Sequence, residues 1–418
     1  MSLVVIVGQG YVGLPLAMRA AAVGHDVVGF DTDVDRVKRL SAGDSFVEDV
    51  ASKTLCDALA TGRYQPTADE AACQGFDIGV ITVPTPLTEG VPDLSFIQSA
   101  AATLGRHLQR GSTVILESTT YPGTTLELLI PMLEETSGLA AGMSFHVGYS
   151  PERIDPGNRT WTLVNTPKVI SGIDAESLGK VKDFYDSVVG STVAVSRTQE
   201  AELVKLIENT FRHVNVALVN EIAMFAADLG INVWEALDAA ATKPFGFMRF
   251  TPGPGVGGHC LPVDPSYLSW RVKRRAGETF RFVELANDIN DHMPRYVVRR
   301  LTLALNRLQQ SVNGTHVLVL GLAYKANTGD ARESPALAVV DNLVALGAEV
   351  RAVDPYVESS RIDPKIALVD LSAEELVWAD CVVVVTDHDC FDWDLVKERA
   401  RFVFDTRRRL SGPNVEHL

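Results

Sequence analysis

The chain opens with an apolar run that a glycine-rich turn interrupts at once. Residues 3–7 are all apolar, and Gly8-Gln-Gly-Tyr-Val-Gly13 follows directly. A helical pattern then leads to a second apolar run, residues 26–30, which ends in Asp31. The order strand, glycine turn, helix, strand and acid predicts a parallel α/β unit of the kind that binds dinucleotides.

The residues of this turn have distinct roles in that interpretation. Gly8 permits the tight turn, Gly10 lets the main chain approach a pyrophosphate, and Gly13 lets the helix pack on the strand. Asp31 is expected to bind the adenosine ribose hydroxyls, which favours NAD over NADP, although Arg36 is close enough in sequence to weaken that preference. Tyr11 and Val12 complete the predicted cofactor-binding turn.

Three further apolar runs end in polar loops. Residues 77–83 lead into Pro84 and Thr85, residues 113–117 into Ser118 and Thr119, and residues 145–149 into Ser150-Pro-Glu152-Arg153. Ligands of a doubly wound sheet bind outside the carboxyl ends of its strands. We therefore expect Thr85, Thr119 and Glu152 to line one crevice, although helix capping or turn formation explains each residue equally well.

The rest of the chain indicates three domains. Residues 198–229 lack Gly and Pro and predict one long helix, followed by a second helix over residues 233–241. From about residue 300 the order of strand, glycine loop, helix, strand and acid returns, without the full glycine triplet. The prediction is an α/β protein with two Rossmann-like doubly wound domains, residues 1–196 and 301–418, joined by a central helical domain, residues 197–300.

Composition limits the classes of function. The formal net charge of −15 argues against binding to nucleic acid or to an anionic membrane. No apolar run approaches the roughly 18 residues of a membrane helix. The five cysteines show neither metal-site spacing nor a disulfide framework. We expect a cytoplasmic protein with reduced thiols and no metal.

One cysteine follows an unusual stretch of small and rigid residues. Thr251-Pro-Gly-Pro-Gly-Val-Gly-Gly precedes His259 and Cys260, and Asp264 comes four residues later. Glycine lets a main chain approach a ligand and proline fixes its path, so we expect a loop that presents the thiol into a pocket. A surface turn with a structural cysteine is the simpler explanation of this stretch alone. His259 and Cys260 are expected to point apart, as neighbours in an extended loop do.

Taken together, separated motifs resemble the nucleotide-sugar 6-dehydrogenases, the UDP-glucose/UDP-N-acetylhexosamine dehydrogenase family. The resemblance covers nearly the whole chain and rests on Gly8–Gly13, Ser118-Thr119, Ser150-Pro-Glu152, Glu202–Asn209, Gly253–Asp264 and Gly321–Ser334. It implies an NAD domain, a central region that forms a homodimer, and a UDP-sugar domain, acting in nucleotide-sugar metabolism and polysaccharide biosynthesis.

Within the family the chain looks most similar to the UDP-N-acetylglucosamine 6-dehydrogenases, on the motifs of residues 150–158, 242–246 and 257–265. Arg153 stands where the glucose branch typically has an aromatic residue, and Val263 stands where that branch usually has Lys. UDP-glucose and UDP-N-acetylmannosamine (UDP-ManNAc) remain alternative substrates.

The chemistry of such an enzyme suits Cys260. Oxidising a primary alcohol to a carboxylate removes four electrons and therefore requires two NAD+. A thiolate holds the intermediate aldehyde as a thiohemiacetal, which a second oxidation converts into a thioester. Lys205 and Asn209, four residues apart on the long helix, would stabilise the developing oxyanion, although such a pair alone is more often solvated.

Hydrolysis of the thioester requires an activated water. Asp264 together with Thr119, or alternatively Glu152, is the predicted acid or base. Which of Glu152, Asp264 and Lys205 takes the first alcohol proton stays open.

The resemblance implies the remaining contacts. The predicted substrate-binding residues are Glu152, Arg153, Lys205, Asn209, Arg249, Gly257, Tyr324, Lys325 and Arg407, with Arg408 as an alternative to Arg407. The predicted cofactor-binding residues also include Pro84, Thr85, Ser118, Thr119 and Arg332, the last of these acting across a dimer.

Two rival functions would require fewer of these residues and domains. A two-electron hydroxyacid dehydrogenase requires neither Cys260 nor a second nucleotide domain. A catalytically silent NAD- or nucleotide-sensing protein has no use for Cys260, Lys205, Asn209 and Asp264 together.

Overall fold

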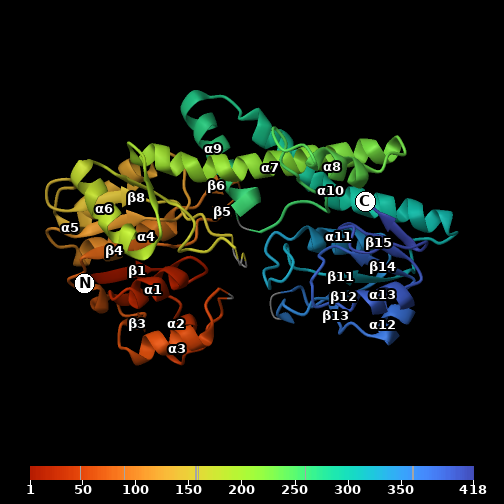
Figure 1. Ribbon diagram of the computed structural model, residues 1–418, viewed down its shortest axis with the longest axis horizontal. Helices are drawn as coiled ribbons and strands as arrows, with labels where there is room; N and C mark the ends of the chain where they lie inside the picture. Colours follow the sequence, from red (N-terminus) through yellow and green to blue (C-terminus); the bar gives the residue numbers. More distant parts are fainter. Residues whose placement is uncertain (48, 89, 156–157, 159, 259, 360–361) are drawn as a thin grey trace. The chain divides into compact units, whose positions relative to one another are not determined.

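The computed structural model describes residues 1–47, 49–88, 90–155, 158, 160–258, 260–359 and 362–418, without the side chain of Cys260. Its contacts form two compact units: Met1–Glu208 with Trp270–Gly277, and Asn209–Ser269 with Glu278–Leu418. The predicted long helix is confirmed as α7, Thr198–Asp228, drawn as one continuous helix in Figure 1, and it contributes residues to both units. The predicted α/β class, with two sheets and a helical region, is also confirmed.

The first unit is built on a mostly parallel sheet. Its strands are β1 Leu3–Val7, β2 Asp26–Phe30, β3 Tyr64–Thr67, β4 Ile78–Ile81, β7 Thr113–Leu116, β8 His146–Tyr149, β9 Lys168–Gly172 and β10 Thr192–Ala194. They run in the order β10-β9-β8-β7-β4-β1-β2-β3. Strand β9 runs antiparallel to β8, and the other neighbours in this sheet are parallel. The carboxyl ends of β1, β4, β7 and β8 therefore share one edge.

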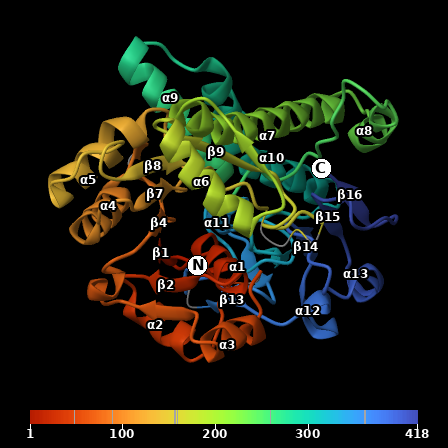
Figure 2. The same ribbon diagram turned by 60° about the vertical axis from the view of Figure 1, so that its left-hand side comes forward.

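Helices cover both faces of this sheet. Because side chains alternate along a strand, Val4 and Ile6 point to one face, where α1 Gly13–Ala22 and α6 Ala175–Val188 complete a buried core. On the other face α4 Ser95–His107 packs its Leu104 against Gly79, and α5 Ile130–Ser137 lies beside α4 (Figure 2). The remaining elements are α2 Val34–Ser41, α3 Ser52–Ala60, η1 Glu70–Cys73, η2 Thr125–Leu129 and a hairpin of β5 Leu87–Thr88 and β6 Val91–Pro92.

The second unit contains a sheet whose paired strands are all parallel. Its strands are β11 His316–Leu320, β12 Glu349–Val353, β13 Ala367–Leu368, β14 Cys381–Val384, β15 Val403–Asp405 and β16 Val415–His417, in the order β13-β12-β11-β14-β15-β16. Its helices are α8 Val233–Ala241, α10 Arg281–Arg307, α11 Pro335–Ala345, α12 Ala373–Trp378 and α13 Trp393–Arg399, besides its parts of α7 and α9.

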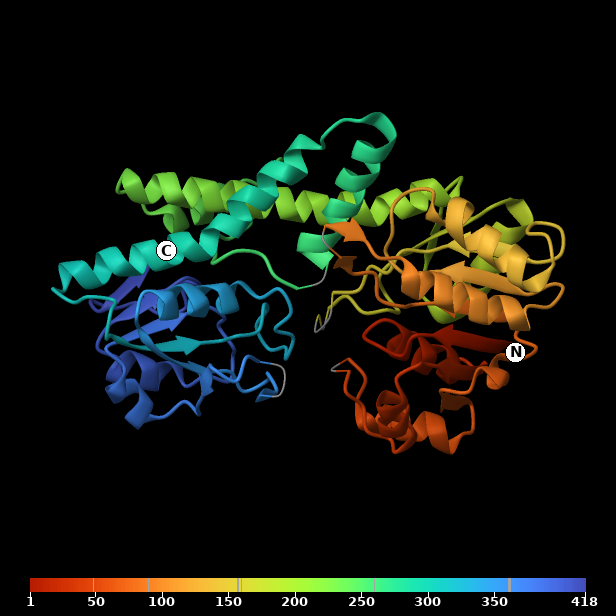
Figure 3. The ribbon, with the colours of Figure 1, turned by 180° about the vertical axis from the view of Figure 1, so that it is seen from behind.

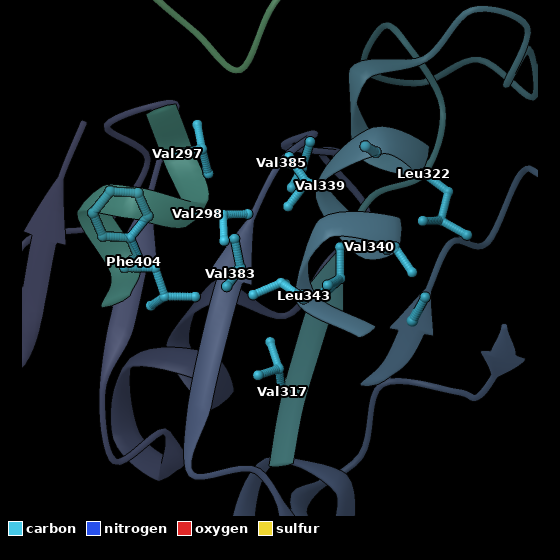
Figure 4. Close-up of a cluster of buried hydrophobic side chains, with 14 of the residues drawn as sticks. Val297, Val298, Val317, Leu322, Val339, Val340, Leu343, Val383, Val385 and Phe404 are labelled. Carbon is cyan, nitrogen blue, oxygen red and sulfur yellow. The ribbon is translucent and has the colours of Figure 1, made fainter. Parts of the chain in front are cut away.

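Alternation along these strands divides the second core in two. Val317 and Val383 face α10 and α11, which run side by side in Figure 3, and Figure 4 draws this cluster with Val340 and Phe404. Leu318 and its neighbours on the other face pack with α12 and α13. The sheet is buried on both faces, as parallel sheets generally are.

The cysteine stretch departs from the expected loop. Helix α9, Cys260–Ala276, begins at the cysteine, so the prediction of a loop through Asp264 is wrong. Pro262 falls in the first helical turn, where no intrahelical N–H bond is required, and its presence together with Pro265 masked the helix in the sequence. Asp264 consequently lies about one helical turn after position 260. His259 lies outside the described residues.

Among the described residues, none of the helices combines the length and the hydropathy of a membrane-spanning segment.

Candidate active site

The glycine turn after β1 is tight at its ends and open in its middle. Gly8 has φ +94°, and a Cβ there would lie 2.8 Å from the Thr82 carbonyl oxygen. A Cβ at Gly13 would lie 1.8 Å from the Gly8 carbonyl oxygen, whereas one at Gly10 meets nothing within 4 Å. Larger side chains are therefore excluded at Gly8 and Gly13, whereas the chain leaves open space at Gly10. Tyr11 and Val12, half-buried, lead from the turn into α1.

Asp31 stands at the end of β2 and faces this turn. One oxygen of its carboxylate accepts the Gln9 N–H at 2.8 Å and the Arg36 guanidinium at 2.8 Å, and the other accepts the Asp33 N–H at 3.0 Å. Arg36 is therefore engaged by Asp31, which is 5% exposed.

The polar residues after β4 and β7 gather at the same sheet edge. Ser118 Oγ donates to the Val83 carbonyl at 2.8 Å, which ties the two strand ends together. Thr85 and Ser118 are buried, Thr119 is half-buried, and Pro84 is exposed. The structure thus brings these predicted cofactor-binding residues to one edge of the sheet.

Glu152 follows β8 at that edge and is held by three donors. Its Oε1 accepts the N–H groups of Arg153 and Ile154, each at 2.6 Å, and its Oε2 lies 3.2 Å from the Lys168 ammonium. Burial opposes charge on Glu152, but the ammonium groups of Lys168 and Lys205 outweigh it and lower its pKa. These two cations therefore favour the ionised form of Glu152.

Lys205 is a buried cation on α7 and not the solvated residue that its spacing alone would suggest. Among the described residues its ammonium has no hydrogen-bond or ion-pair partner, although it acts on the charge of Glu152. Arg153, in contrast, is occupied: it pairs with Glu208 at 2.6 Å and donates to the Pro167 carbonyl at 2.6 Å.

Asn209 and Asp264 form a buried pair in the second unit. The Asn209 amide nitrogen donates to Asp264 Oδ2 at 2.5 Å, and Arg212 donates to the Asn209 carbonyl oxygen. Asn209 and Asp264 are 0% and 1% exposed. Because Arg212 occupies the carbonyl oxygen of the amide, the N–H₂ of Asn209 is directed toward Asp264.

The stretch before Cys260 is fixed near both of its ends within the second unit. The Gly253 N–H donates to Asn220 Oδ1 at 2.9 Å, and the Gly258 N–H donates to the Arg332 carbonyl at 3.0 Å. A Cβ at Gly257 would lie 2.6 Å from the Glu333 carbonyl oxygen and 2.8 Å from Tyr324 Cβ. Glycine is required here because the stretch lies against the loop after β11.

The remaining predicted residues are distributed unevenly. Tyr324 and Lys325 are half-buried in the loop after β11. Arg249 and Arg332 are exposed and paired with Asp238 and Asp330, at 2.7 and 2.6 Å respectively. The structure does not bring Arg249 to the glycine-rich stretch by any described contact.

Arg407 and Arg408 differ, which separates the two alternatives. Arg407 Nε donates to the Val385 carbonyl at 2.7 Å, its guanidinium lies beside Gly253, and no carboxylate of the described residues pairs with it. Burial lowers the pKa of this guanidinium, although the charges of Asp387 and Asp405 oppose that shift. Arg408 is exposed and pairs with Asp238 at 2.5 Å. Arg407 is thus the better candidate for binding an anion.

The sequence matches one family along nearly its whole length. Residues 2–189, 199–292 and 318–412 match the NAD-binding, central and UDP-binding domains of the UDP-glucose/GDP-mannose dehydrogenase family. The chain belongs to this family. It is an NAD-dependent UDP-sugar dehydrogenase.

Similar proteins of the family carry two different sugar names. A UDP-N-acetyl-D-mannosamine dehydrogenase of Pyrococcus horikoshii is 36% identical, covering 99% of this chain and 97% of its own. A UDP-N-acetyl-D-glucosamine 6-dehydrogenase of Salmonella typhi is 35% identical, covering 93% and 90%. A solved UDP-D-ManNAc dehydrogenase of P. horikoshii superposes with a TM-score of 0.90 at 34% identity, covering 99% and 98%. The similarities therefore do not single out the UDP-N-acetylglucosamine branch.

The predicted catalytic residues of this dehydrogenase are divided between its units. Thr119, Glu152 and Lys205 belong to the first unit, and Asn209 and Asp264 to the second. The side chain of Cys260 lies outside the described residues. The described part of the chain contains no group of three or more His, Cys, Asp or Glu side chains arranged to hold a metal ion.

Sequence reasoning missed several polar residues of the dehydrogenase. Lys168 and Glu117 form a buried ion pair at 2.9 Å, and Arg212 orients Asn209. Lys168 is visible in the sequence only as a lysine at the start of a largely apolar strand, which does not indicate what it contacts. Arg212 had none, since on a long helix it is indistinguishable from a solvated residue.

Proposed function

We propose that this chain is a UDP-N-acetylhexosamine 6-dehydrogenase that oxidises the C6 alcohol to the uronic acid and releases two NADH. The supporting observation is the buried hydrogen bond between Asn209 and Asp264, with Asp264 about one helical turn after position 260. A two-electron alcohol oxidation needs no thiol, whereas this arrangement places a carboxylate, hydrogen-bonded to a buried amide, four residues after one.

The proposed roles follow from side-chain chemistry. The Cys260 thiolate adds to the aldehyde and holds it as a thiohemiacetal, which becomes a thioester when the second hydride leaves. The N–H₂ of Asn209 and the ammonium of Lys205 stabilise negative charge on the substrate oxygen. Glu152, or Asp264 with Thr119, takes a proton from the water that hydrolyses the thioester and returns the thiol.

The first unit has the residues that NAD requires. The open space at Gly10, the N-terminus of α1 and the carboxylate of Asp31 fit a pyrophosphate and a ribose. NAD+ supplies the hydride acceptor for both oxidations. Pro84, Thr85, Ser118 and Thr119 are proposed to bind its nicotinamide half, and Arg332 to reach it from a partner subunit.

The second unit is proposed to bind the UDP-sugar. Arg407 offers a guanidinium that forms no ion pair with a carboxylate of the described residues, although Asp387 and Asp405 act on its charge, and a guanidinium suits a diphosphate. Gly257, Tyr324 and Lys325 are proposed to contact the substrate from the loops around it, and Arg249 less directly. Arg153, being paired with Glu208, is proposed to act on the substrate mainly through its N–H bond to Glu152.

The proposed sugar is a UDP-N-acetylhexosamine. Arg153 and Val263 depart from the glucose-type pattern, and the motifs of residues 150–158, 242–246 and 257–265 favour UDP-N-acetylglucosamine. UDP-ManNAc is supported by the similarity to dehydrogenases of that sugar. UDP-glucose is the remaining alternative.

The deciding experiment measures NADH release with UDP-GlcNAc, UDP-ManNAc, UDP-GalNAc and UDP-glucose side by side. We expect two NADH per uronic acid and preference for one N-acetylated sugar. One NADH per sugar without acid would overturn the four-electron assignment. Cys260→Ser should abolish acid formation, while Cys390→Ser, which changes an exposed thiol, serves as the matched control.

A homodimer through α7 is also proposed. Exposed apolar residues recur on this helix at helical spacing, among them Leu218, Ile222 and Phe225, which are 50%, 43% and 60% exposed. A second copy of the chain would bury this stripe. Phe225→Glu should yield monomers in light scattering, while Val377→Glu, a change of an exposed valine on α12, should not. A monomeric wild-type protein would refute the dimer.

A further inference from the structure

Three charged side chains are buried together at the carboxyl edge of the first sheet. The Lys168 ammonium lies 2.9 Å from Glu117 Oε1 and 3.2 Å from Glu152 Oε2. The side chains of Lys168, Glu117 and Glu152 are 4%, 0% and 12% exposed. One cation thus serves two carboxylates, and a buried cluster of this kind is costly unless its geometry is well satisfied.

The antiparallel strand of this sheet explains how the cluster forms. Glu117 follows β7 and Glu152 follows β8, so both lie at the carboxyl edge. Lys168 is the first residue of β9, and the register pairs Tyr149 with Ser171. Continuing that register brings Lys168 alongside Glu152. A parallel β9 would place its first residue at the opposite edge of the sheet, because parallel strands align their carboxyl ends.

We propose that Lys168 is a positioning residue that, together with Glu117, fixes the orientation and the charge of the Glu152 carboxylate. The proposal rests on the proposed function, in which Glu152 acts as an acid or base. The antiparallel direction of β9 thus places the Lys168 ammonium at the edge where the parallel strands β7 and β8 end.

The contacts of Glu152 support a fixed orientation. Two main-chain N–H groups hold Oε1 and the ammonium holds Oε2, so rotation of the carboxylate would break at least one of these bonds. The Lys168 ammonium also lies over the ring of Tyr185, with Nζ 5.3 Å from the ring centroid.

The titratable groups around Lys168 and Glu152 come from four elements. The carboxylates of Glu117, after β7, and Glu152, after β8, act on the charge of Lys168. Tyr185 of α6 presents its ring to Lys168, and Lys205 of α7 acts on the charge of Glu152. Tyr185 donates its hydroxyl to Glu117, while Glu117 Oε2 is buried without a hydrogen-bond partner among the described residues. Burial raises the pKa of Glu117 despite the opposing attraction of Lys168. Glu117 is therefore the carboxylate that accepts a proton first, and its ionisation weakens the hold of Lys168 on Glu152.

Three variants test the proposal through the pH profile of turnover with UDP-sugar and NAD+. Lys168→Met leaves two buried carboxylates without their shared cation, so the acidic limb should move up by at least about one pH unit. Turnover at pH 7 should fall about 10- to 100-fold. In Glu117→Gln, Glu152 is the remaining carboxylate paired with Lys168, so the acidic limb of the pH profile should move to lower pH. Lys168→Arg retains the charge and should restore most of the wild-type profile.

The acidic limb should move in opposite directions in Lys168→Met and Glu117→Gln, and this distinguishes a positioning role from a purely structural one. Lost packing would lower turnover in both Lys168→Met and Glu117→Gln without shifting their limbs in opposite senses, and that result would overturn the proposal. Thermal unfolding and the KM for NAD+ check that each variant is folded and binds cofactor.

A second readout is independent of the reaction. The Glu152 carboxylate can be titrated by infrared difference spectroscopy, with its band assigned against Glu152→Gln. If no UDP-sugar reduces NAD+ with the wild-type protein, the proposed function fails while this measurement still stands. A Glu152 band that titrates at the same pH in wild type and Lys168→Met would overturn the positioning role.

Discussion

The two sheets of the molecule start from the same order of strand, glycine turn, helix, strand and acid, but they use the acid differently. Asp31 accepts the Gln9 N–H and pairs with Arg36, whose side chain is 35% exposed. Asp354 accepts the N–H groups of Leu322 and Ala323 at 2.7 and 2.9 Å and lies 3.0 Å from His388, with both side chains fully buried. The hydrogen-bonding capacity of Asp354 is thus used by the loop after β11 and by His388.

The glycine turns after β1 and β11 are alike at their first glycine and differ two residues later. Gly8 and Gly321 both have positive φ, +94° and +85°, and in both a Cβ would collide with a threonine carbonyl of a neighbouring strand end. Gly10, which leaves open space, corresponds to Ala323, which is fully buried. The turn after β1 thus leaves open space at Gly10, while the corresponding position of the turn after β11 is closed.

The largest expected effect comes from filling the open turn. Gly10→Leu adds a side chain where nothing lies within 4 Å, so the free energy of unfolding should change little. The Kd for NAD+, measured by calorimetry, should rise at least about 100-fold, which corresponds to roughly 2.7 kcal/mol. Gly179→Leu, also at a glycine with open space, is the control. Unchanged NAD+ binding in Gly10→Leu would remove this turn from the cofactor site.

Arg407 provides the corresponding test of the second sheet. Arg407→Met removes a half-buried guanidinium that has no carboxylate partner among the described residues, so the unfolding free energy should change by less than about 1 kcal/mol. UDP binding, measured by calorimetry, should weaken about 10- to 100-fold, since charge-assisted bonds to phosphate contribute roughly 1.5–3 kcal/mol.

Arg408→Met is the matched control, because Arg408 pairs with Asp238 at the surface. Equal losses of UDP binding in the two variants would argue for a general effect of positive charge and against a specific site at Arg407.

The two acids should respond in opposite ways to the same substitution. Asp31→Asn should raise the KM for NAD+ about 10-fold, as loss of one good hydrogen bond does, with a smaller effect on stability than Asp354→Asn because its partner Arg36 is 35% exposed. Asp354→Asn should leave that KM unchanged but lower the unfolding free energy by about 1–3 kcal/mol, because buried donors lose their acceptor. Steady-state kinetics and urea unfolding measure both. An altered KM for NAD+ in Asp354→Asn would break the distinction between the two sheets.

Sequence reasoning succeeded where a local pattern determines the structure. The helix of residues 198–228 lacks breakers, and the glycine turns have a required φ, so both are visible in the sequence. It failed at Cys260–Asp264, where proline content suggested a loop although the first turn of a helix tolerates proline. It also missed Lys168, because the contact with Glu152 depends on the antiparallel register of β9, which no local pattern specifies.

The smallest expected effect is a pH dependence of stability that differs between Asp354 and Glu202, two carboxylates that each hold a loop at the end of a strand. Burial opposes charge on Asp354, but the hydrogen bond and charge of His388 outweigh it and lower its pKa, so its contribution to stability is lost only in acid. Glu202 accepts the Thr125 N–H at 2.8 Å, and burial raises its pKa to about 7. A raised carboxyl pKa means that the folded state binds more protons, so this contribution is present below about pH 4.5 and is lost as the pH rises through about 7.

The unfolding free energy should therefore fall by about 1 kcal/mol between pH 6 and pH 8. Glu202→Gln should flatten that slope in urea unfolding, and Glu200→Gln, a change of a surface carboxylate on the same helix, should not. An unchanged slope in Glu202→Gln would show that Glu202 is ionised throughout this range. The loop with Thr119 would then be held by a permanent charge, as the loop after β11 is held by Asp354.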